Sequence, residues 1–179
     1  MAAISHQRVA AFFAEGNGPI SAYQKGKRLE ELIIYVFEKI PGIEFYKANV
    51  VNHGNSEEVD VAFFNNKART GFPFLEYFLL VECKNWSVLI GAAQVREFAT
   101  KLKRRACPNG VLVAANGITG NAQELNAAHH EITMTLAVES IKIIVVTRPE
   151  IEAWTDTADV VKLFKLKLLE LTVAGSIFL

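Results

Sequence analysis

The sequence predicts an α/β fold in which a central mixed β-sheet lies between helices. Several segments carry apolar residues at spacings of three and four, as amphipathic helices do. Between them lie short runs rich in valine, isoleucine and phenylalanine, which are typical of strands. The order is helix, three strands, helix, strand, helix, strand, helix, and this order favours an α/β sandwich.

The predicted elements follow one another in chain order. They are a short helix over 4–15, a helix over 21–39, strands over 43–51 and 57–64, a strand from Phe78 to a charged tip at Glu82-Cys83-Lys84, a helix that begins near Gln94, a strand over 111–116, a helix over 121–138, a strand over 141–147, a helical turn carrying Trp154, and a last helix that begins at Asp156-Thr157.

Punctuating residues support these boundaries. Gly16-Asn17-Gly18-Pro19 and Pro41-Gly42 end the first two helices, because glycine and proline favour turns over continued helix. Asn121 and Glu124 have the spacing of a capping box and predict that the fourth helix begins there. Asp156 is suited to cap the last helix.

Length and composition limit the organisation of the chain. With 179 residues, 51% of them hydrophobic, the chain can build one core, and we expect one domain over 1–179 whose core covers about 20–155. The first helix and the last helix with its tail are expected as appendages. No apolar run reaches the roughly 18 residues that span a bilayer, and no signal peptide pattern precedes the core, so we expect a cytoplasmic protein without a membrane partner.

Charge and cysteine content exclude two further classes. The formal net charge is zero, so binding to nucleic acid through overall positive charge is excluded and local clusters would have to supply it. Two cysteines, Cys83 and Cys107, lie far apart in sequence and without Cys-x-x-Cys spacing. Neither a disulfide nor a zinc site is expected.

Glu82 and Lys84 stand at the end of an otherwise apolar strand. Because side chains alternate between the two faces of a strand, both project to one face, at the rim of the core, while Cys83 points the other way. If the strand over 57–64 lies antiparallel to it, Asp60 stands beside Glu82. Two carboxylates and a lysine make an oxygen-rich site for Mg2+ with an amine beside the metal-bound water. A solvated ion pair at the strand end is the simpler alternative.

Asp60, followed at strand distance by Glu82-Cys83-Lys84, resembles the D…(D/E)-x-K signature of the PD-(D/E)XK nuclease superfamily. The surroundings are similar to its Mrr-like restriction endonuclease branch, and the likeness covers about residues 20–155. Two departures are visible: Val59 stands where the family usually has proline, and the segment from Asp60 to Glu82 is longer than in compact members.

The resemblance implies a restriction-endonuclease-like sandwich and a DNA endonuclease that hydrolyses phosphodiester bonds to leave 5′-phosphate ends. Asp60, Glu82 and the backbone carbonyl of Cys83 would hold Mg2+, for which Mn2+ can substitute. Lys84 would position or deprotonate the attacking water. The alternative is a non-catalytic nucleic-acid-binding or assembly module that retains the nuclease fold.

Two residues outside the signature also match the family. Glu30, in the helix that opens with Gly26-Lys27-Arg28, resembles the glutamate of the first core helix, which would act through water or a second ion. Gln94 resembles the glutamine at the start of the helix after the signature, where it would orient the water or a phosphate. For each, an ordinary polar residue at a helix edge is an equally simple explanation.

Basic residues gather in two clusters that we interpret as DNA phosphate contacts. Cations near a helix end also complement the helix dipole, which is the alternative explanation. The predicted contacts are Lys27, Arg28, Arg96, Lys101, Lys103, Arg104 and Arg105.

A double-strand break requires two sites facing opposite strands, and we therefore expect a homodimer. The apolar tail over 173–179 and the first helix, with its phenylalanines, are the interface candidates. The alternative is that both segments pack on their own core. A monomer that nicks one strand would need a separate recognition partner protein.

Overall fold

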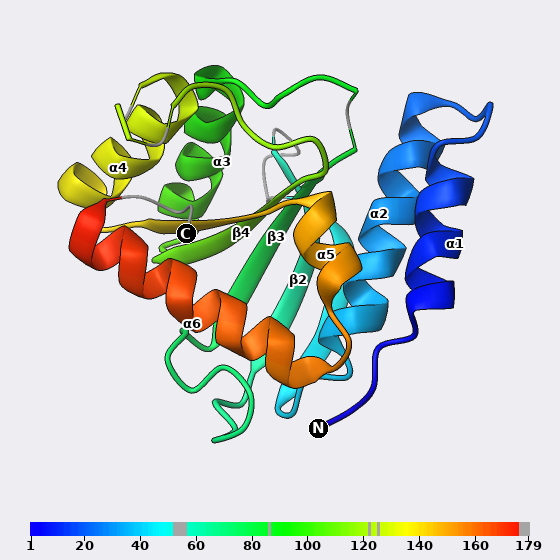
Figure 1. Ribbon diagram of the computed structural model, residues 1–179. Helices are drawn as coiled ribbons and strands as arrows, with labels where there is room; N and C mark the ends of the chain where they lie inside the picture. The colour runs from blue at the N-terminus through cyan, green and yellow to red at the C-terminus, as the bar shows by residue number, and fades with distance from the viewer. Residues whose placement is uncertain (52–56, 86, 122, 125, 176–179) are drawn as a thin grey trace.

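A five-stranded mixed sheet forms the centre of the molecule, with helices on both faces (Figure 1). The computed structural model describes residues 1–51, 57–85, 87–121, 123–124 and 126–175. Strands β1 to β3 pair antiparallel, while β3, β4 and β5 pair parallel. The predicted α/β sandwich with a mixed sheet is confirmed. The strands stand in chain order: β1 (Ile43–Val51), β2 (Glu58–Asn65), β3 (Phe78–Lys84), β4 (Asn109–Ala114) and β5 (Lys142–Val146).

The helices also lie within the predicted segments or close to them, although the predicted end of α2 and the predicted start of α4 differ from the structure. None of the described helices is long and apolar enough to cross a membrane. Their bounds are α1 (His6–Gly16), α2 (Ala22–Phe37), α3 (Ala92–Arg104), α4 (Ala127–Glu139), α5 (Arg148–Ala153) and α6 (Thr157–Ala174).

Strand β3 divides its side chains between two cores, one on each face of the sheet. Leu79, Val81 and Cys83 join the core that α1, α2, α5 and α6 complete, whereas Leu80 joins the core beneath α3 and α4. Cys83 therefore points into the first core, as predicted. By the same alternation Glu82 lies on the face that α3 covers. The charged tip of β3 is thus presented to a helix rather than to open solvent.

Helix α2 is fixed at both ends, by a cap at its N-terminus and by buried aromatic contacts at its C-terminus. Ser21 and Gln24 form a capping box at the N-terminus. At the other end Phe37 is fully buried and contacts Phe63 of β2 and Phe164 of α6, with ring centroids 5.3 and 5.7 Å apart. These aromatic contacts join α2 to the sheet and to α6. The prediction placed the end of this helix two residues too late, at position 39.

The prediction for the start of α4 was wrong. The helix begins at Ala127 rather than at 121, with Asn126 at its N-cap position. Asn121 does use its side chain to accept backbone N–H groups, from Gln123 and Glu124 at 2.8 and 3.2 Å, but it stabilises a turn. Asparagine caps turns and helices by the same hydrogen bond, so the pattern alone did not separate them.

The first helix packs on its own chain. Val9 and Phe13 are buried in the core, and Phe12 packs against that core beside Tyr35. For α1 the structure therefore has the alternative to a dimer interface, which is packing on the core of its own chain. Of the predicted apolar tail, residues 176–179 lie outside the described residues. Val173 belongs to the last turn of α6, where it is 77% exposed.

Candidate active site

The site forms where β2 and β3 stop pairing. Their backbone pairing ends at Val61 and Val81. At the next position the Asp60 side chain replaces the ladder: its Oδ2 accepts the backbone N–H of Cys83 at 2.6 Å. The antiparallel arrangement of the two strands is confirmed, and it brings Asp60 next to the Glu82-Cys83-Lys84 tip.

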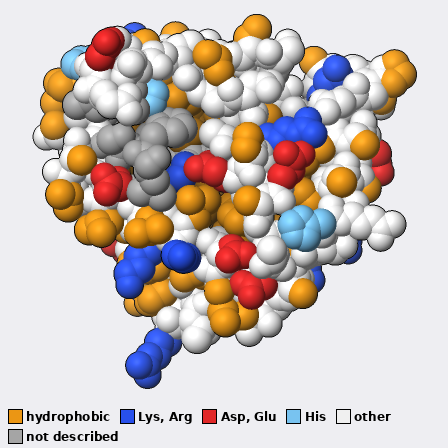
Figure 2. Space-filling view, in the orientation of Figure 1, with side chains coloured by type: hydrophobic (Ala, Val, Ile, Leu, Met, Phe, Trp, Pro, Cys, Tyr) orange, Lys and Arg blue, Asp and Glu red, His pale blue; other side chains and the backbone are white. Residues whose placement is uncertain are grey.

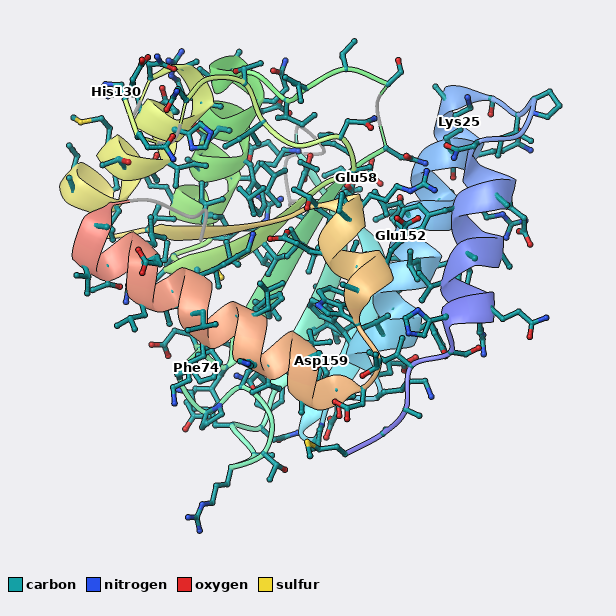
Figure 3. All side chains as sticks on the ribbon, viewed as in Figure 1. Lys25, Glu58, Phe74, His130, Glu152 and Asp159 are labelled. Atoms are coloured by element: carbon teal, nitrogen blue, oxygen red, sulfur yellow. The ribbon has the colours of Figure 1, made fainter. Side chains whose placement is uncertain are left out.

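The long segment between Asp60 and Glu82 leaves this arrangement intact. Its loop lies at the other end of β2, where the fully buried Asn65 side chain donates to the carbonyls of Phe72 and Glu76 at 2.9 and 3.0 Å. Figure 3 shows the two ends, with Glu58 near the site and Phe74 on the opposite side of the molecule. The insertion therefore lengthens the chain without displacing Asp60.

Glu82 is deeply buried, with only 2% of its surface exposed. Its Oε1 accepts hydrogen bonds from Lys84 Nζ and from Lys101 Nζ, both at 2.8 Å. Its Oε2 is buried and has no hydrogen-bond partner among the described residues. The expectation that Glu82 lies at the rim of the core was wrong, because α3 covers this part of the sheet.

Lys101 is the residue that sequence reasoning assigned differently. It was predicted as an exposed phosphate contact, but it is 7% exposed and reaches Glu82 from α3. A more distant contact joins it to Glu97 at 3.4 Å. The signal was present in the sequence, because Lys101 lies three residues after Phe98 and next to Leu102, inside the apolar stripe that faces the sheet.

The two carboxylates affect each other. Burial, and then the negative charge of Glu82, raise the pKa of Asp60 from 3.8 to about 6, against the smaller opposing effects of the Cys83 N–H and Lys84. Glu30 contributes in the same direction as Glu82. Negative charge is thus concentrated around Asp60 beyond what the nearby lysine compensates.

Glu30 lies on the α2 side of this cluster and is 7% exposed. Lys27 donates to Glu30 Oε2 at 2.8 Å and to Asn49 Oδ1 of β1 at 2.6 Å. Lys27 was predicted as a phosphate contact, but the structure ties it between α2 and β1. The neighbouring residue Arg28, which is half-buried, instead pairs with Glu31 at 2.6 Å.

Gln94 and the remaining predicted phosphate contacts all have partners within the chain. Gln94 Oε1 accepts the N–H of Gly91 at 3.2 Å and so stabilises the start of α3. Figure 2 shows acidic and basic side chains interspersed over the visible face. The predicted phosphate contacts on α3 and just after its C-terminus each pair with a glutamate. Their partners are Glu131 for Arg96, Glu139 for Lys103, and Glu57 for Arg104 and Arg105.

A pocket of about 520 Å3 opens over the carboxylates. No group of three or more His, Cys, Asp or Glu side chains within the described ranges is arranged to hold a metal ion. Asp60 and Glu82 nevertheless place two carboxylates, which are hard oxygen ligands, on the wall of one pocket. The pocket is lined by Glu57, Glu58, Asp60, Glu82, Lys84, Glu97, Thr100 and Lys101.

Comparison with known families agrees with this geometry. The family model described as restriction endonuclease, of the Mrr catalytic type, matches residues 22–153, from α2 to the end of α5. No curated protein matches the chain. The matched region contains the whole sheet together with Glu30, Asp60, Glu82 and Lys84. Because the match covers well over half of the 179 residues, this chain belongs to the Mrr-type restriction endonuclease family, with its PD-(D/E)XK-like catalytic domain.

Proposed function

We propose that this chain is a metal-dependent DNA endonuclease that hydrolyses phosphodiester bonds. One observation carries the proposal: a buried carboxylate oxygen, Glu82 Oε2, has no hydrogen-bond partner among the described residues, and Glu82 lines the same pocket as Asp60. Leaving such an oxygen unpaired costs free energy unless a ligand fills the position. A divalent cation is the ligand that two neighbouring carboxylates fit best.

Asp60, Glu82 and the Cys83 carbonyl would hold Mg2+ or Mn2+. When bound, the ion would polarise the scissile phosphate and lower the pKa of a bound water. The raised pKa of Asp60 is consistent with this role, since a cation relieves the repulsion between the two carboxylates.

Lys84 would position or deprotonate the attacking water and offset negative charge as the phosphate is attacked. It is suited to this because its side chain is 22% exposed in the pocket, whereas Glu82 is 3% exposed. Glu30 would act on the bound cation indirectly, through a water molecule or through a second ion. The amide nitrogen of Gln94 would orient a phosphate while its oxygen holds Gly91.

One observation favours the second candidate, a nucleic-acid-binding or assembly module without catalysis. Two lysines already neutralise Glu82, and a site whose charges are compensated in this way is stable without a metal. In that case the protein would bind DNA equally well with and without divalent cations. Cation-dependent strand cleavage separates the two candidates.

The test is nicking of supercoiled plasmid by the full chain with Mg2+, Mn2+ or Ca2+, and in EDTA. Wild type is expected to nick with Mg2+ and Mn2+ and not in EDTA, with 5′-phosphate at the cut. Glu82→Gln and Lys84→Met should abolish nicking, while Lys165→Met, an exposed lysine of α6, should not. Wild-type rates in Glu82→Gln and Lys84→Met would rule out this active site.

Glu30 has a matched control in its neighbour Glu31. Glu30 is buried and Glu31 is exposed, yet both pair with a cation on the same helix. We expect Glu30→Gln to lose about tenfold in rate, since a ligand that acts through water contributes less than a direct one. Glu31→Gln should stay within about twofold. Equal losses in the two variants would remove Glu30 from the site.

The substrate and the assembly belong to the same proposal. We propose a homodimer that presents two sites to opposite strands, or a monomer that nicks and depends on a recognition partner protein. A cleavage panel of linear, methylated, branched and single-stranded DNA identifies the substrate class. Linear products that appear without a nicked intermediate would support the dimer.

A further inference from the structure

Two ammonium groups share one oxygen of Glu82. Lys84 Nζ and Lys101 Nζ each lie 2.8 Å from Oε1, and the other oxygen, Oε2, accepts no hydrogen bond from a described residue. The D…(D/E)-x-K signature accounts for Lys84 and has no place for Lys101, which comes from α3. The second lysine therefore needs its own explanation.

The two lysines are held differently. The Lys101 side chain is 9% exposed, and Lys101 belongs to the face of α3 that carries the buried residues Phe98 and Leu102. Lys84 is the last residue of β3, and its side chain is 22% exposed at the pocket. A cation buried as deeply as Lys101 loses free energy if it leaves its partner, whereas Lys84 can regain solvent or a phosphate.

We infer that Lys101 is a positioning residue that holds Glu82 by Oε1, so that Oε2 is left to the cation and Lys84 can turn to the reacting water. The inference rests on the proposed nuclease function and adds a division of labour to it. Lys84 cannot both neutralise Glu82 and serve the water. With Lys101 in place, Glu82 keeps a hydrogen bond to Oε1 after Lys84 has moved.

Cation binding without turnover tests this inference directly. Ca2+ titrations by calorimetry on the full chain should show binding about tenfold weaker in Lys101→Met than in wild type, the lower end of the effect of a residue that orients a metal ligand. Lys84→Met should bind Ca2+ within about threefold of wild type, because Lys84 is released when the cation binds. Lys165→Met is the control for removal of one positive charge elsewhere.

The sign of the change separates positioning from simple charge. Removing a positive charge near a cation site should strengthen cation binding by electrostatics alone. Weaker Ca2+ binding in Lys101→Met therefore points to loss of Glu82 orientation. Binding as tight as wild type, or tighter, overturns the inference.

The Mg2+ dependence of cleavage gives a second readout. In Lys101→Met the Mg2+ concentration for half-maximal cleavage should rise about tenfold, with most of the maximal rate recovered at saturating Mg2+. In Lys84→Met the maximal rate itself should be lost at every concentration. A merely structural role for Lys101 would lower the maximal rate and the melting temperature without moving the half-saturation point, and this result would also overturn the inference.

Two further arms keep the outcome decisive. If Lys101→Met does not fold by circular dichroism, Lys101→Gln, which keeps an N–H donor for Oε1, and Lys101→Ala, refolded in osmolyte, are titrated in its place. Unchanged Ca2+ affinity and unchanged Mg2+ half-saturation in Lys101→Gln count against the inference only if Lys101→Ala also binds Ca2+ as tightly as wild type. Wild type that binds no Ca2+ overturns the metal site and the inference together. Wild type and Lys101→Met that bind Ca2+ equally overturn the inference alone.

Discussion

Asp60→Asn should stabilise the metal-free protein at neutral pH while it abolishes cleavage. The pKa of Asp60 is raised to about 6 from an ordinary value of 3.8, because the carboxylate is buried and faces Glu82. The rise from 3.8 to about 6 corresponds to about 3 kcal/mol, and solvent at the mouth of the pocket screens part of it, so we expect the free energy of unfolding to increase by about 1–2 kcal/mol. Asparagine keeps an oxygen that can accept the Cys83 N–H, so the local hydrogen bond survives.

The sign follows from proton binding. Between pH 3.8 and about 6 the folded wild type binds more protons at Asp60 than the unfolded chain does, so its stability falls as the pH rises through this window. Relative to wild type, the variant should therefore show no gain at pH 3.5 and its full gain at pH 8. Below the window both forms of the wild type carry a neutral carboxyl, and above it the cost of the buried charge is constant.

The assay is urea unfolding of wild type and Asp60→Asn from pH 3.5 to 8 in EDTA, which removes bound cations. Asp159→Asn is a control of opposite sign. Hydrogen bonds from Thr155 lower the pKa of Asp159, so the wild-type carboxylate stabilises the fold above the ordinary pKa of aspartate and the variant should lose stability at pH 8. A less stable Asp60→Asn at pH 8, or a difference that does not change with pH, would refute the reasoning.

Three other predictions concern the buried charges and the assembly. Glu82→Ala should lower the free energy of unfolding by about 3–5 kcal/mol in urea, because it leaves Lys101 buried without its main partner, and a loss below 1 kcal/mol would contradict this. Lys167 is fully buried between Glu150 and the Val145 carbonyl. In the same assay Lys167→Met should change the free energy of unfolding by no more than about 1 kcal/mol, whereas Lys167→Ala should lower it by about 2–4 kcal/mol. Equal losses in the two variants would show that charge matters more than volume. If α6 forms the proposed dimer, a double Leu169→Glu and Val173→Glu variant should be a monomer by light scattering, and an unchanged dimer would remove α6 as the interface.

The fold was predictable because local signals agreed along most of the chain. Helix α2 has a capping box, a continuous apolar stripe and a proline-glycine stop, and each of these depends on nearby residues alone. The start of α4 was not predictable in the same way. Asn121 satisfies the sequence pattern of a cap, but its side chain stabilises a turn, and which of the two occurs depends on the contacts around Asn126.

The site was predictable in its strands and not in its helix contacts. Alternation along β3 and an antiparallel β2 are enough to bring Asp60 to the tip that carries Glu82. The burial of Glu82 and its contact with Lys101 depend on how α3 lies across the sheet, and that packing cannot be read from a single strand. Lys101 was interpreted as a phosphate contact because it belongs to a basic run, although its position in the apolar stripe of α3 indicated burial.

The distribution of charge limits how this chain can hold DNA. Each cation of the α3 cluster already has a carboxylate partner, so a phosphate must replace an existing ion pair instead of meeting an open basic surface. Exposed exchanges of this kind contribute little net free energy. Under the proposed function, most of the affinity near the cut would come from the cation held by Asp60 and Glu82. Under the same proposal, the rest would come from a second copy of the chain or from a recognition partner, because the formal net charge of zero provides no general attraction to DNA.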